Sequence, residues 1–293
     1  MSGATVRARA QPSQTPVAQI EPAASASPSA VPSSSPPARP TPSSAPAPFT
    51  YSHVFVIVME NRSYAQAISG GYTSKLARQY GYATNYHGVS HPSLPNYLAM
   101  TSGSTHGITD DGYYVLPAGD LGTQLTSARI SWRAYMEGMT GACTTSTYPY
   151  AVKHDPFAYY GGRCPSNVVP FTHFAGDMKG TVPRFVWITP DMCHDGHDCS
   201  TATADAWLSK TVPVILNSTA WKQGGVLFVT WDEGEDSANS VLTIVVHPRP
   251  KVKTSRIAYN HYNLLATIEG VFGLKRLGAA ASATPMSDLM AIS

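Results

Sequence analysis

Apolar residues along the chain are concentrated in a few short runs, which polar segments rich in glycine and proline separate. Continuous apolar runs that contain many β-branched residues are typical of strands buried on both faces of a sheet. Such runs occupy residues 54–59, 185–189, 226–231 and 241–246, and a weaker one occupies residues 130–135. The pattern predicts a strand at each of these positions.

Helical periodicity lies between and after these runs. Residues 204–216 carry spaced apolar positions after a Thr/Asp start. A last helix has one apolar face followed by Gly273 as a stop signal, and this face is formed by Leu264, Leu265, Ile268, Val271 and Phe272. Helices that alternate with strands predict an α/β fold with a mostly parallel sheet.

Polar residues directly follow three of the predicted strands. Glu60-Asn61 follows the first, Pro190-Asp191 and a histidine cluster follow the run at 185–189, and Asp232-Glu233 follows the run at 226–231. Ligands of open α/β sheets bind beyond the carboxyl ends of the strands. We therefore expect these side chains to converge on one site.

The side chains of Glu60, Asn61, Asp232 and Glu233 offer only oxygen acceptors. Three acids and an amide suit a hard divalent cation. The alternative is that Asp232 and Glu233 are ordinary loop acids, one of them capping a helix.

A second candidate site is the segment His91-Pro92-Ser93-Leu94-Pro95-Asn96, which precedes a helical pattern at 97–102. Ser93 is expected at or near a helix N-terminus, where free backbone amides attract phosphate. The alternative is that Ser93 only caps the helix. The sequence contains neither a Gly-x-Ser-x-Gly elbow nor a P-loop motif, which argues against an α/β-hydrolase esterase and a P-loop nucleotide site.

The ten histidines all follow Thr50, and a few have informative neighbours. His194 and His197 lie close to Asp191, His154 lies in Lys-His-Asp-Pro-Phe, and His261 begins the last predicted helix. We expect the remaining histidines outside these motifs to be structural, namely His53, His87, His106, His173 and His247.

Composition divides the chain into two parts. Of its 293 residues, the first fifty contain 11 of the 24 prolines, and this Ala/Pro/Ser/Thr-rich stretch predicts a disordered leader or linker over 1–50. One globular domain is predicted over 51–293. Lys and Arg (20) nearly balance Asp and Glu (18), so no charge excess favours nucleic acid. No apolar run approaches the ~18 residues of a membrane helix, so we expect no transmembrane segment.

Four cysteines allow three disulfide pairings. Local pairing predicts the bonds Cys143–Cys164 and Cys193–Cys199. A competing hypothesis is a zinc site made by Cys193, His194, His197 and Cys199, although the spacing differs from the usual zinc motifs. An even cysteine count beside a Pro/Ser-rich spacer indicates a secreted or cell-surface protein, although the first residues contain no apolar segment typical of a signal peptide.

Six motifs in order resemble the bacterial phosphoesterase family of acid phosphatases and phospholipase C-type enzymes. They extend from about Tyr51 to the C-terminus: Val-Ile-Val-Met-Glu-Asn-Arg-Ser-Tyr at 56–64, His-Pro-Ser-Leu-Pro-Asn-Tyr-Leu-Ala-Met-Thr-Ser-Gly at 91–103, Lys-His-Asp-Pro-Phe at 153–157, the segment 189–199, Thr-Trp-Asp-Glu-Gly at 230–234, and His-Tyr-Asn-Leu-Leu-Ala-Thr-Ile-Glu at 261–269. The second motif is also similar to the Thr-Phe-Pro-Asn stretch of nucleotide pyrophosphatases/phosphodiesterases, whose Thr is the nucleophile. Its form is most similar to secreted actinobacterial acid phosphatases.

The resemblance implies an alkaline-phosphatase-like α/β/α sandwich. It implies that Glu60, Asn61, Asp232 and Glu233 hold one divalent cation (Ca, Mg, Mn or Zn), and that Ser93 attacks phosphorus. His197 matches a family histidine that contacts the phosphoryl oxygens. Asp191 and His194 stand where relatives often have Asn, which puts a catalytic role for His194 in doubt.

The expected activity is therefore that of a secreted acid phosphatase, which hydrolyses phosphate monoesters through a phosphoserine at Ser93. Asn61 and His261 are the expected substrate-binding residues, and His154 or His91 would protonate the leaving alcohol. The expected substrate is a small phosphate ester or a phospholipid headgroup. The alternatives are a phospholipase C-type phosphodiesterase, a phosphoinositide phosphatase and, from another class, a non-catalytic surface protein on a Pro/Ser-rich stalk.

Overall fold

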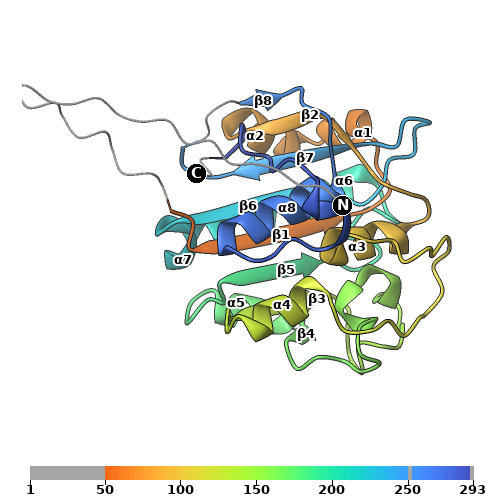
Figure 1. Ribbon diagram of the computed structural model, residues 1–293. Helices are drawn as coiled ribbons and strands as arrows, with labels where there is room; N and C mark the ends of the chain where they lie inside the picture. The colour runs from red at the N-terminus through yellow and green to blue at the C-terminus, as the bar shows by residue number, and fades with distance from the viewer. Residues whose placement is uncertain (1–49, 250–252, 291–293) are drawn as a thin grey trace, which may run out of the picture. The chain divides into compact units, whose positions relative to one another are not determined.

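The computed structural model describes residues 50–249 and 253–290, and the predicted leader lies outside the described residues except for Thr50. A nine-stranded sheet with the order β4-β3-β5-β1-β6-β7-β2-β8 forms the middle layer, and β9 also pairs with β2 (Figure 1). The strands are β1 (His53–Met59), β2 (Tyr82–His87), β3 (Trp132–Met136), β4 (Val168–Pro170), β5 (Phe185–Thr189), β6 (Gly225–Trp231), β7 (Ser240–Val246), β8 (Thr254–Ser255) and β9 (Tyr259–Asn260).

Helices cover both faces of this sheet, as an α/β/α sandwich requires (Figure 1). On one face α3 packs against α8 and contacts α4, whereas α2 packs against α6 on the other. The α-helices are α1 (Tyr64–Ile68), α2 (Gly71–Gln79), α3 (Ser93–Ser102), α4 (Leu121–Ser127), α5 (Phe174–Asp177), α6 (Thr201–Asn217), α7 (Thr219–Lys222) and α8 (His261–Phe272). Four short 3-10 helices occupy Val152–His154, Pro156–Ala158, Phe171–His173 and Gly278–Ala281.

All five predicted strands are present, and the mixed, mostly parallel sheet confirms the predicted fold class. The direction of β7 differs from the parallel expectation, because it runs antiparallel to both β6 and β2. The strand β2 was not predicted, because its sequence Tyr-Ala-Thr-Asn-Tyr-His alternates in polarity and is only partly buried.

The central strand β1 aligns the site. Its residues from Val54 to Met59 are fully buried, and it pairs in parallel with β5 and β6. Met59 lies opposite Trp231, so the two strands end at the same level, and the Asp232 N–H donates to the Met59 carbonyl at 3.0 Å. The register of the sheet therefore sets Glu60 and Asp232 side by side.

Both predicted disulfides are present, Cys143–Cys164 and Cys193–Cys199. The zinc hypothesis for the second pair is wrong, because a disulfide leaves no thiolate for a metal ion. Among the described residues, no helix has the length and apolarity needed to cross a membrane.

The C-terminal end of α3 is fixed against a turn that follows α8. Gly103 ends α3 with a φ of 70° and accepts a hydrogen bond at its carbonyl from Ala279 N–H at 2.8 Å. A Cβ on Gly103 would overlap the carbonyl oxygen of Leu277. The Glu269 carboxyl of α8 in turn accepts from Leu277 N–H at 2.8 Å. This contact holds the helix whose first residue is Ser93.

We predict that Gly103→Ala destabilises the fold more than Gly107→Ala does. Both glycines have a φ near 70°, so each substitution carries the conformational cost of about 1 kcal/mol that a left-handed alanine incurs. Only Gly103 also meets backbone atoms, whereas a Cβ at Gly107 meets nothing within 4 Å. Urea unfolding of the two variants measures the difference, and equal free energies of unfolding would contradict the steric role of Gly103.

We also predict that Glu269 makes stability depend on pH. Burial raises its pKa to about 7, although the Leu277 N–H and the charge of Arg276 oppose the shift. Between about pH 4.5 and 7 the unfolded chain loses this proton while the folded chain keeps it, so the free energy of unfolding falls as pH rises, by up to about 3 kcal/mol. When the free energy of unfolding is measured by urea titration at several pH values in this range, it should fall less steeply with pH for Glu269→Gln than for the wild type. An unchanged pH dependence would contradict the assignment.

Candidate active site

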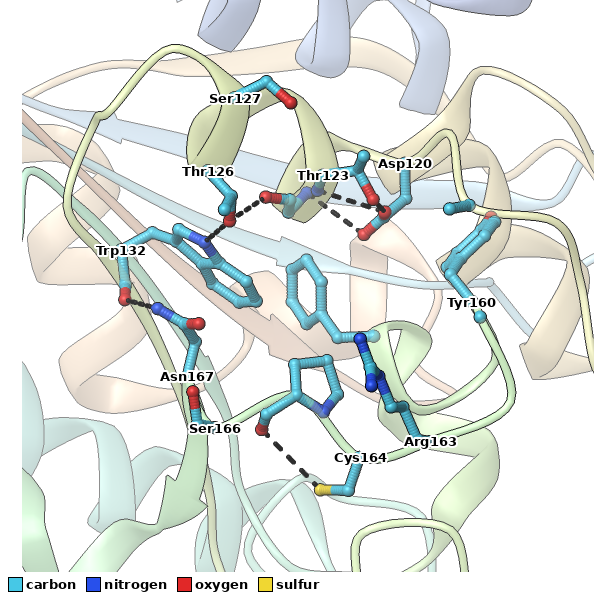
Figure 2. A pocket seen from close by; sticks show the side chains of 15 residues that line it. Asp120, Thr123, Thr126, Ser127, Trp132, Tyr160, Arg163, Cys164, Ser166 and Asn167 are labelled. Atoms are coloured by element: carbon cyan, nitrogen blue, oxygen red, sulfur yellow. Dashed lines mark hydrogen bonds between the residues drawn. The ribbon is translucent and has the colours of Figure 1, made fainter.

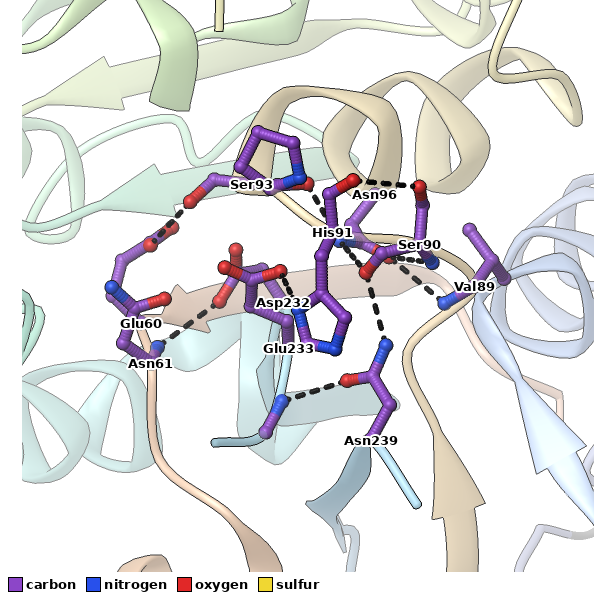
Figure 3. A network of polar contacts seen from close by, with 12 residues as sticks. Glu60, Asn61, Val89, Ser90, His91, Ser93, Asn96, Asp232, Glu233 and Asn239 are labelled. Carbon is purple, nitrogen blue, oxygen red and sulfur yellow. Dashed lines mark hydrogen bonds and ion pairs between the residues drawn. The ribbon is translucent and has the colours of Figure 1, made fainter. Parts of the chain in front are cut away.

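A cluster of polar side chains lies beyond the carboxyl ends of β1, β5 and β6, as the sequence predicts. Figure 3 shows the part of it that follows β1 and β6. Glu60 follows β1, and its N–H donates to the carbonyl of Asp195 in the loop after β5 at 2.9 Å. Asp232 follows β6, and its Oδ1 accepts from the Asn61 N–H at 3.2 Å. Three strand ends therefore meet, although the third contributes Asp195 and His197 rather than Asp191.

Ser93 is the first residue of α3, and Pro92 occupies the N-cap position. The alternative that Ser93 is only an N-cap is therefore wrong. Its side chain is 1% exposed, and its hydroxyl donates to Glu60 Oε2 at 3.0 Å (Figure 3). Tyr97 lies one turn further along the same face of α3 and donates its hydroxyl to Glu60 Oε1 at 2.6 Å. Both oxygens of Glu60 are thus aimed by the same helix.

The loop before α3 is held by the Asn96 side chain. Its Oδ1 accepts from the N–H groups of Val89 and Ser90, and its Nδ2 donates to the carbonyls of Ser90 and Pro92 (Figure 3). These four hydrogen bonds fix the backbone that presents His91 and Ser93. The sequence analysis noted Asn96 as part of the motif but did not predict this role.

His154 is buried between two acids. Its Nε2 lies 3.3 Å from Glu60 Oε2 and its Nδ1 lies 3.2 Å from Asp195 Oδ2, while its ring stacks on Tyr97 with centroids 5.4 Å apart. Burial lowers the pKa of His154 well below its ordinary value, and the charges of Lys153 and His197 lower it further. His154 therefore packs between Glu60 and Asp195 without an exposed edge, and its Nε2 has no hydrogen-bond partner among the described residues.

In contrast to the buried His154, His91 is open to solvent, because its side chain is 56% exposed. Its Nδ1 lies 2.6 Å from Glu233 Oε2, so the acid holds one ring nitrogen and leaves Nε2 for a ligand (Figure 3). Burial raises the pKa of Glu233, and His91 opposes that shift.

His197 and Lys153 form a cationic edge of the cluster. Lys153 Nζ lies 3.1 Å from His197 Nε2 and 2.9 Å from Asp111 Oδ2, and His197 Nδ1 lies 2.8 Å from Asp198 Oδ1. Burial lowers the pKa of Lys153, but the hydrogen bond and charge of Asp111 outweigh burial, so the pKa is raised overall. Lys153 is therefore an ammonium at neutral pH.

Four residues of this cluster were missed by sequence reasoning, namely Tyr97, Asp111, Lys153 and Asp195. Tyr97, Lys153 and Asp195 lie inside the quoted motifs, near Ser93, His154 and His197. The motifs therefore contained these residues, but nothing in the sequence assigned a role to them. Asp111 lies in a polar turn that carries no such signal, yet its Oδ1 accepts from Leu94 N–H at 3.0 Å. This carboxylate occupies one of the helix-start amides that we expected to meet phosphate.

His261 lies beneath the site. It is fully buried, its Nε2 donates to the backbone carbonyl of Asp232 at 2.5 Å, and its Nδ1 lies 3.1 Å from the Tyr86 hydroxyl. Burial lowers its pKa to about 4, so the imidazole is neutral at physiological pH. The structure thus places His261 against Asp232, and its expected contact with substrate stays a prediction.

Buried acids dominate the electrostatics of the cluster. Burial raises the pKa values of Glu60 and Asp232 well above their ordinary values. The charge of Asp195 raises the pKa of Glu60 further, and the charge of Glu60 raises that of Asp232. Burial likewise raises the pKa of Asp195 to about 8. Asp232 Oδ2 is buried without a hydrogen-bond partner among the described residues. A cation would compensate these charges, so the donor set fits a divalent ion.

Within this cluster two donor sets are available for such an ion, and both include Glu60. A further group of possible ligands, Glu137, Asp191 and His194, lies apart from the cluster. The predicted set adds Asn61, Asp232 and Glu233, whereas the side chains of Glu60, His154 and His197 offer ligand atoms that all lie within 4.8 Å of one another. Each set contains a buried ligand atom without a hydrogen-bond partner among the described residues, namely Asp232 Oδ2 in the first and His154 Nε2 in the second.

Asp191 and His194 belong to a separate cluster. His194 Nδ1 lies 3.1 Å from Glu137 Oε2 and 3.3 Å from Asp191 Oδ2. Trp207 donates its indole N–H to Glu137 Oε1 at 3.2 Å. These contacts hold the loop after β5, which agrees with the doubt about a catalytic His194.

The chain matches known proteins in sequence and fold. The Phosphoesterase family model matches residues 69–275. Identity is 33% over 253 residues to the phosphatidylinositol-3-phosphatase of Mycobacterium tuberculosis, covering 82% of this chain and 83% of that protein. It is 30% over 243 residues to the phosphate-repressible acid phosphatase of Penicillium chrysogenum, covering 76% of this chain and 59% of that protein, so the chain spans about three fifths of the fungal enzyme.

A solved structure supports the fold at a lower level of sequence identity. A protein of the alkaline phosphatase superfamily from Vibrio parahaemolyticus superimposes with a TM-score of 0.57 at 10% identity, over 83% of this chain and 73% of that one. The alkaline-phosphatase-like architecture predicted from the motifs is thereby confirmed. Together with the family match, this shows that the chain belongs to the Phosphoesterase family and is a phosphoric ester hydrolase.

Proposed function

We propose that the chain is an acid phosphatase that hydrolyses phosphate monoesters through a phosphoserine at Ser93. The observation that carries the proposal is the Ser93 hydroxyl, which is buried at the start of α3 and donates to Glu60 among converging acids, imidazoles and an ammonium. Acid phosphatases among its relatives support the same activity.

The first half-reaction forms the P–O bond to Ser93 Oγ and breaks the bond to the leaving alcohol. Glu60 Oε2 accepts the Ser93 proton, because it already accepts that hydroxyl's hydrogen bond. His91 in its protonated form donates a proton to the leaving oxygen, since its ring is exposed and held at Nδ1 by Glu233. Of the two histidines predicted for this step, the buried His154 instead keeps Glu60 in place.

The second half-reaction returns the enzyme to its starting state. His91, now neutral, accepts a proton from the attacking water, and the P–O bond to Ser93 breaks. Ser93 regains its proton from Glu60. Lys153 supplies the positive charge and the N–H groups that bind phosphoryl oxygens throughout, and His197, whose Nε2 accepts from the Lys153 ammonium, lies beside that group.

The proposed ligands of the divalent cation are Glu60, Asn61, Asp232 and Glu233. When bound there, the cation would supply a Lewis acid that lowers the pKa of the Ser93 hydroxyl and withdraws charge from the phosphoryl group. His261 and the Asn61 N–H position Asp232 for this role.

The natural substrate that we propose is a phosphomonoester on a small alcohol or a phosphoinositide headgroup. The similarity over most of both chains to a phosphatidylinositol-3-phosphatase supports the second form. Comparing p-nitrophenyl phosphate with p-nitrophenylphosphorylcholine separates this activity from a phospholipase C-type phosphodiesterase. Two disulfides and acid phosphatase relatives support a secreted or cell-surface location.

We predict that Ser93→Ala lowers kcat on p-nitrophenyl phosphate by about a thousandfold or more, because the nucleophile is lost. Ser90→Ala is the matched control, since this exposed hydroxyl of the same loop donates only to the His91 carbonyl. Wild-type protein quenched during turnover should carry one phosphoryl group on the peptide containing Ser93 by mass spectrometry. Near-normal turnover of Ser93→Ala would disprove the nucleophile assignment.

We predict that chelation lowers both activity and thermal stability, and that Asp232→Asn removes the response of Tm to an added divalent cation. The amide keeps the size of the side chain but removes the charge that the unpartnered Oδ2 offers to a cation. Differential scanning fluorimetry with Ca²⁺, Mg²⁺, Mn²⁺ and Zn²⁺ added separately measures this response. A variant whose Tm still rises as in the wild type would remove Asp232 from the ligand set.

A further inference from the structure

A cavity of about 530 Å³ lies apart from the Ser93 cluster, between α4, the start of β3 and the loop 160–167 (Figure 2). None of the described residues that line it belongs to the candidate active site. Its volume falls in the range of small-molecule sites, which are typically apolar with a few placed polar groups.

The inner wall of the cavity is aromatic. Trp132, Phe157 and Tyr160 are all almost fully buried there, and the rings of Trp132 and Phe157 have centroids 5.0 Å apart. Trp132 is fixed in place, because its indole N–H donates to Thr126 Oγ1 at 2.9 Å and its carbonyl accepts from Asn167 Nδ2 at 2.8 Å. Trp132 and Tyr160 keep a small exposed surface toward the cavity, and the fully buried Phe157 supports the Trp132 ring from behind, so the wall is preformed.

The rim of the cavity carries one cation that has no partner within the described part of the chain. The exposed Arg163 guanidinium forms no hydrogen bond or ion pair there, and it lies across the cavity from Trp132 in Figure 2. The next residue, Cys164, is bonded to Cys143, which ties this rim to the body of the protein. The hydroxyls of Ser127 and Ser166 also lie at the lining without a partner among the described residues.

The acid that lines the cavity does not neutralise Arg163. Asp120 caps α4, because its carboxylate accepts from the N–H groups of Gly122 and Thr123 and from the Thr123 hydroxyl. The helix start and this hydroxyl thus satisfy the Asp120 carboxylate, and the guanidinium fork stays available for an anion.

We propose that this cavity is a second ligand site, which binds a small ring compound carrying one acidic group. The ring would pack on Trp132 and Tyr160, and its carboxylate or sulfonate would pair with Arg163. This proposal does not depend on the chemistry at Ser93, because the two sites share no residue.

The cavity wall packs against side chains that support the reaction site. Phe157 belongs to the motif that contains Lys153 and His154, and its ring makes an edge contact with Trp187 of β5 at 5.6 Å between centroids. Trp187 in turn contacts the ring of Tyr97, at 6.3 Å between centroids. Packed aromatic rings therefore connect the cavity wall to the Tyr97 that holds Glu60.

The test uses 2-naphthalenesulfonate, which a phosphatase does not hydrolyse. Isothermal titration with the full chain should show one saturable site, in the presence of saturating inorganic phosphate that occupies the reaction site. We expect Arg163→Gln to weaken binding about tenfold and Arg78→Gln, an exposed arginine of α2, to leave it unchanged. Ser127→Trp, at the exposed end of α4, should abolish binding by filling the cavity.

Several results would overturn the proposal. They are the absence of saturable binding, displacement of the probe by phosphate, equal losses for the two arginine variants, or unchanged binding to Ser127→Trp. Decanoate separates a ring ligand from an acyl chain, and tighter binding of decanoate with the same dependence on Arg163 would contradict the ring assignment. Turnover of p-nitrophenyl phosphate by Arg163→Gln separates this proposal from the proposed function. The phosphatase activity should persist in this variant even where binding of the probe is lost.

Discussion

The carboxyl groups of Glu60, Asp195 and Asp232 lie beyond the reach of water at one edge of the sheet, and the rest of the site is arranged around them. Burial of an acid costs several kcal/mol unless it keeps its proton or gains a compensating charge. The raised pKa values of all three acids express this cost. Stability alone would favour an apolar residue at these positions, so the three acids lower the free energy of unfolding. Such strain is characteristic of functional sites.

The sheet makes this concentration of charge achievable. Because β1 and β6 pair in parallel and end at the same level, Glu60 and Asp232 are held by backbone that is fully buried on both sides. The helix α3 then supplies two hydroxyl donors, from Ser93 and Tyr97, to the two oxygens of Glu60. The proposed nucleophile Ser93 thus lies on a buried helix start, which positions a side chain more rigidly than a loop does and favours reactions that depend on alignment and charge stabilisation.

The sequence predicted those strands and site residues that are marked by their immediate neighbours in the chain. Apolar β-branched runs marked all five expected strands, and acids that follow such runs marked Glu60 and Asp232 because strand ends meet at one edge. The antiparallel direction of β7 was not predictable, since an apolar run carries no sign of its direction. Tyr97, Asp111 and Lys153 were missed for a related reason. Their roles arise from partners far away in the chain, as when Lys153 meets Asp111, and a single sequence does not show such pairs.

Solvent exposure separates the buried histidines His154 and His261 from the exposed His91. A group that exchanges protons with substrate and water during each turnover must reach them, whereas a buried imidazole that charges without a partner incurs the full desolvation cost. His261 and His154 are buried and have lowered pKa values, which suits neutral rings that position Asp232 and Glu60. His91 is open to solvent and paired with Glu233 at its inner nitrogen. The two motifs that carry Ser93 and Lys153 thus each contribute one histidine, and their different burial supports the proposed proton transfer by His91.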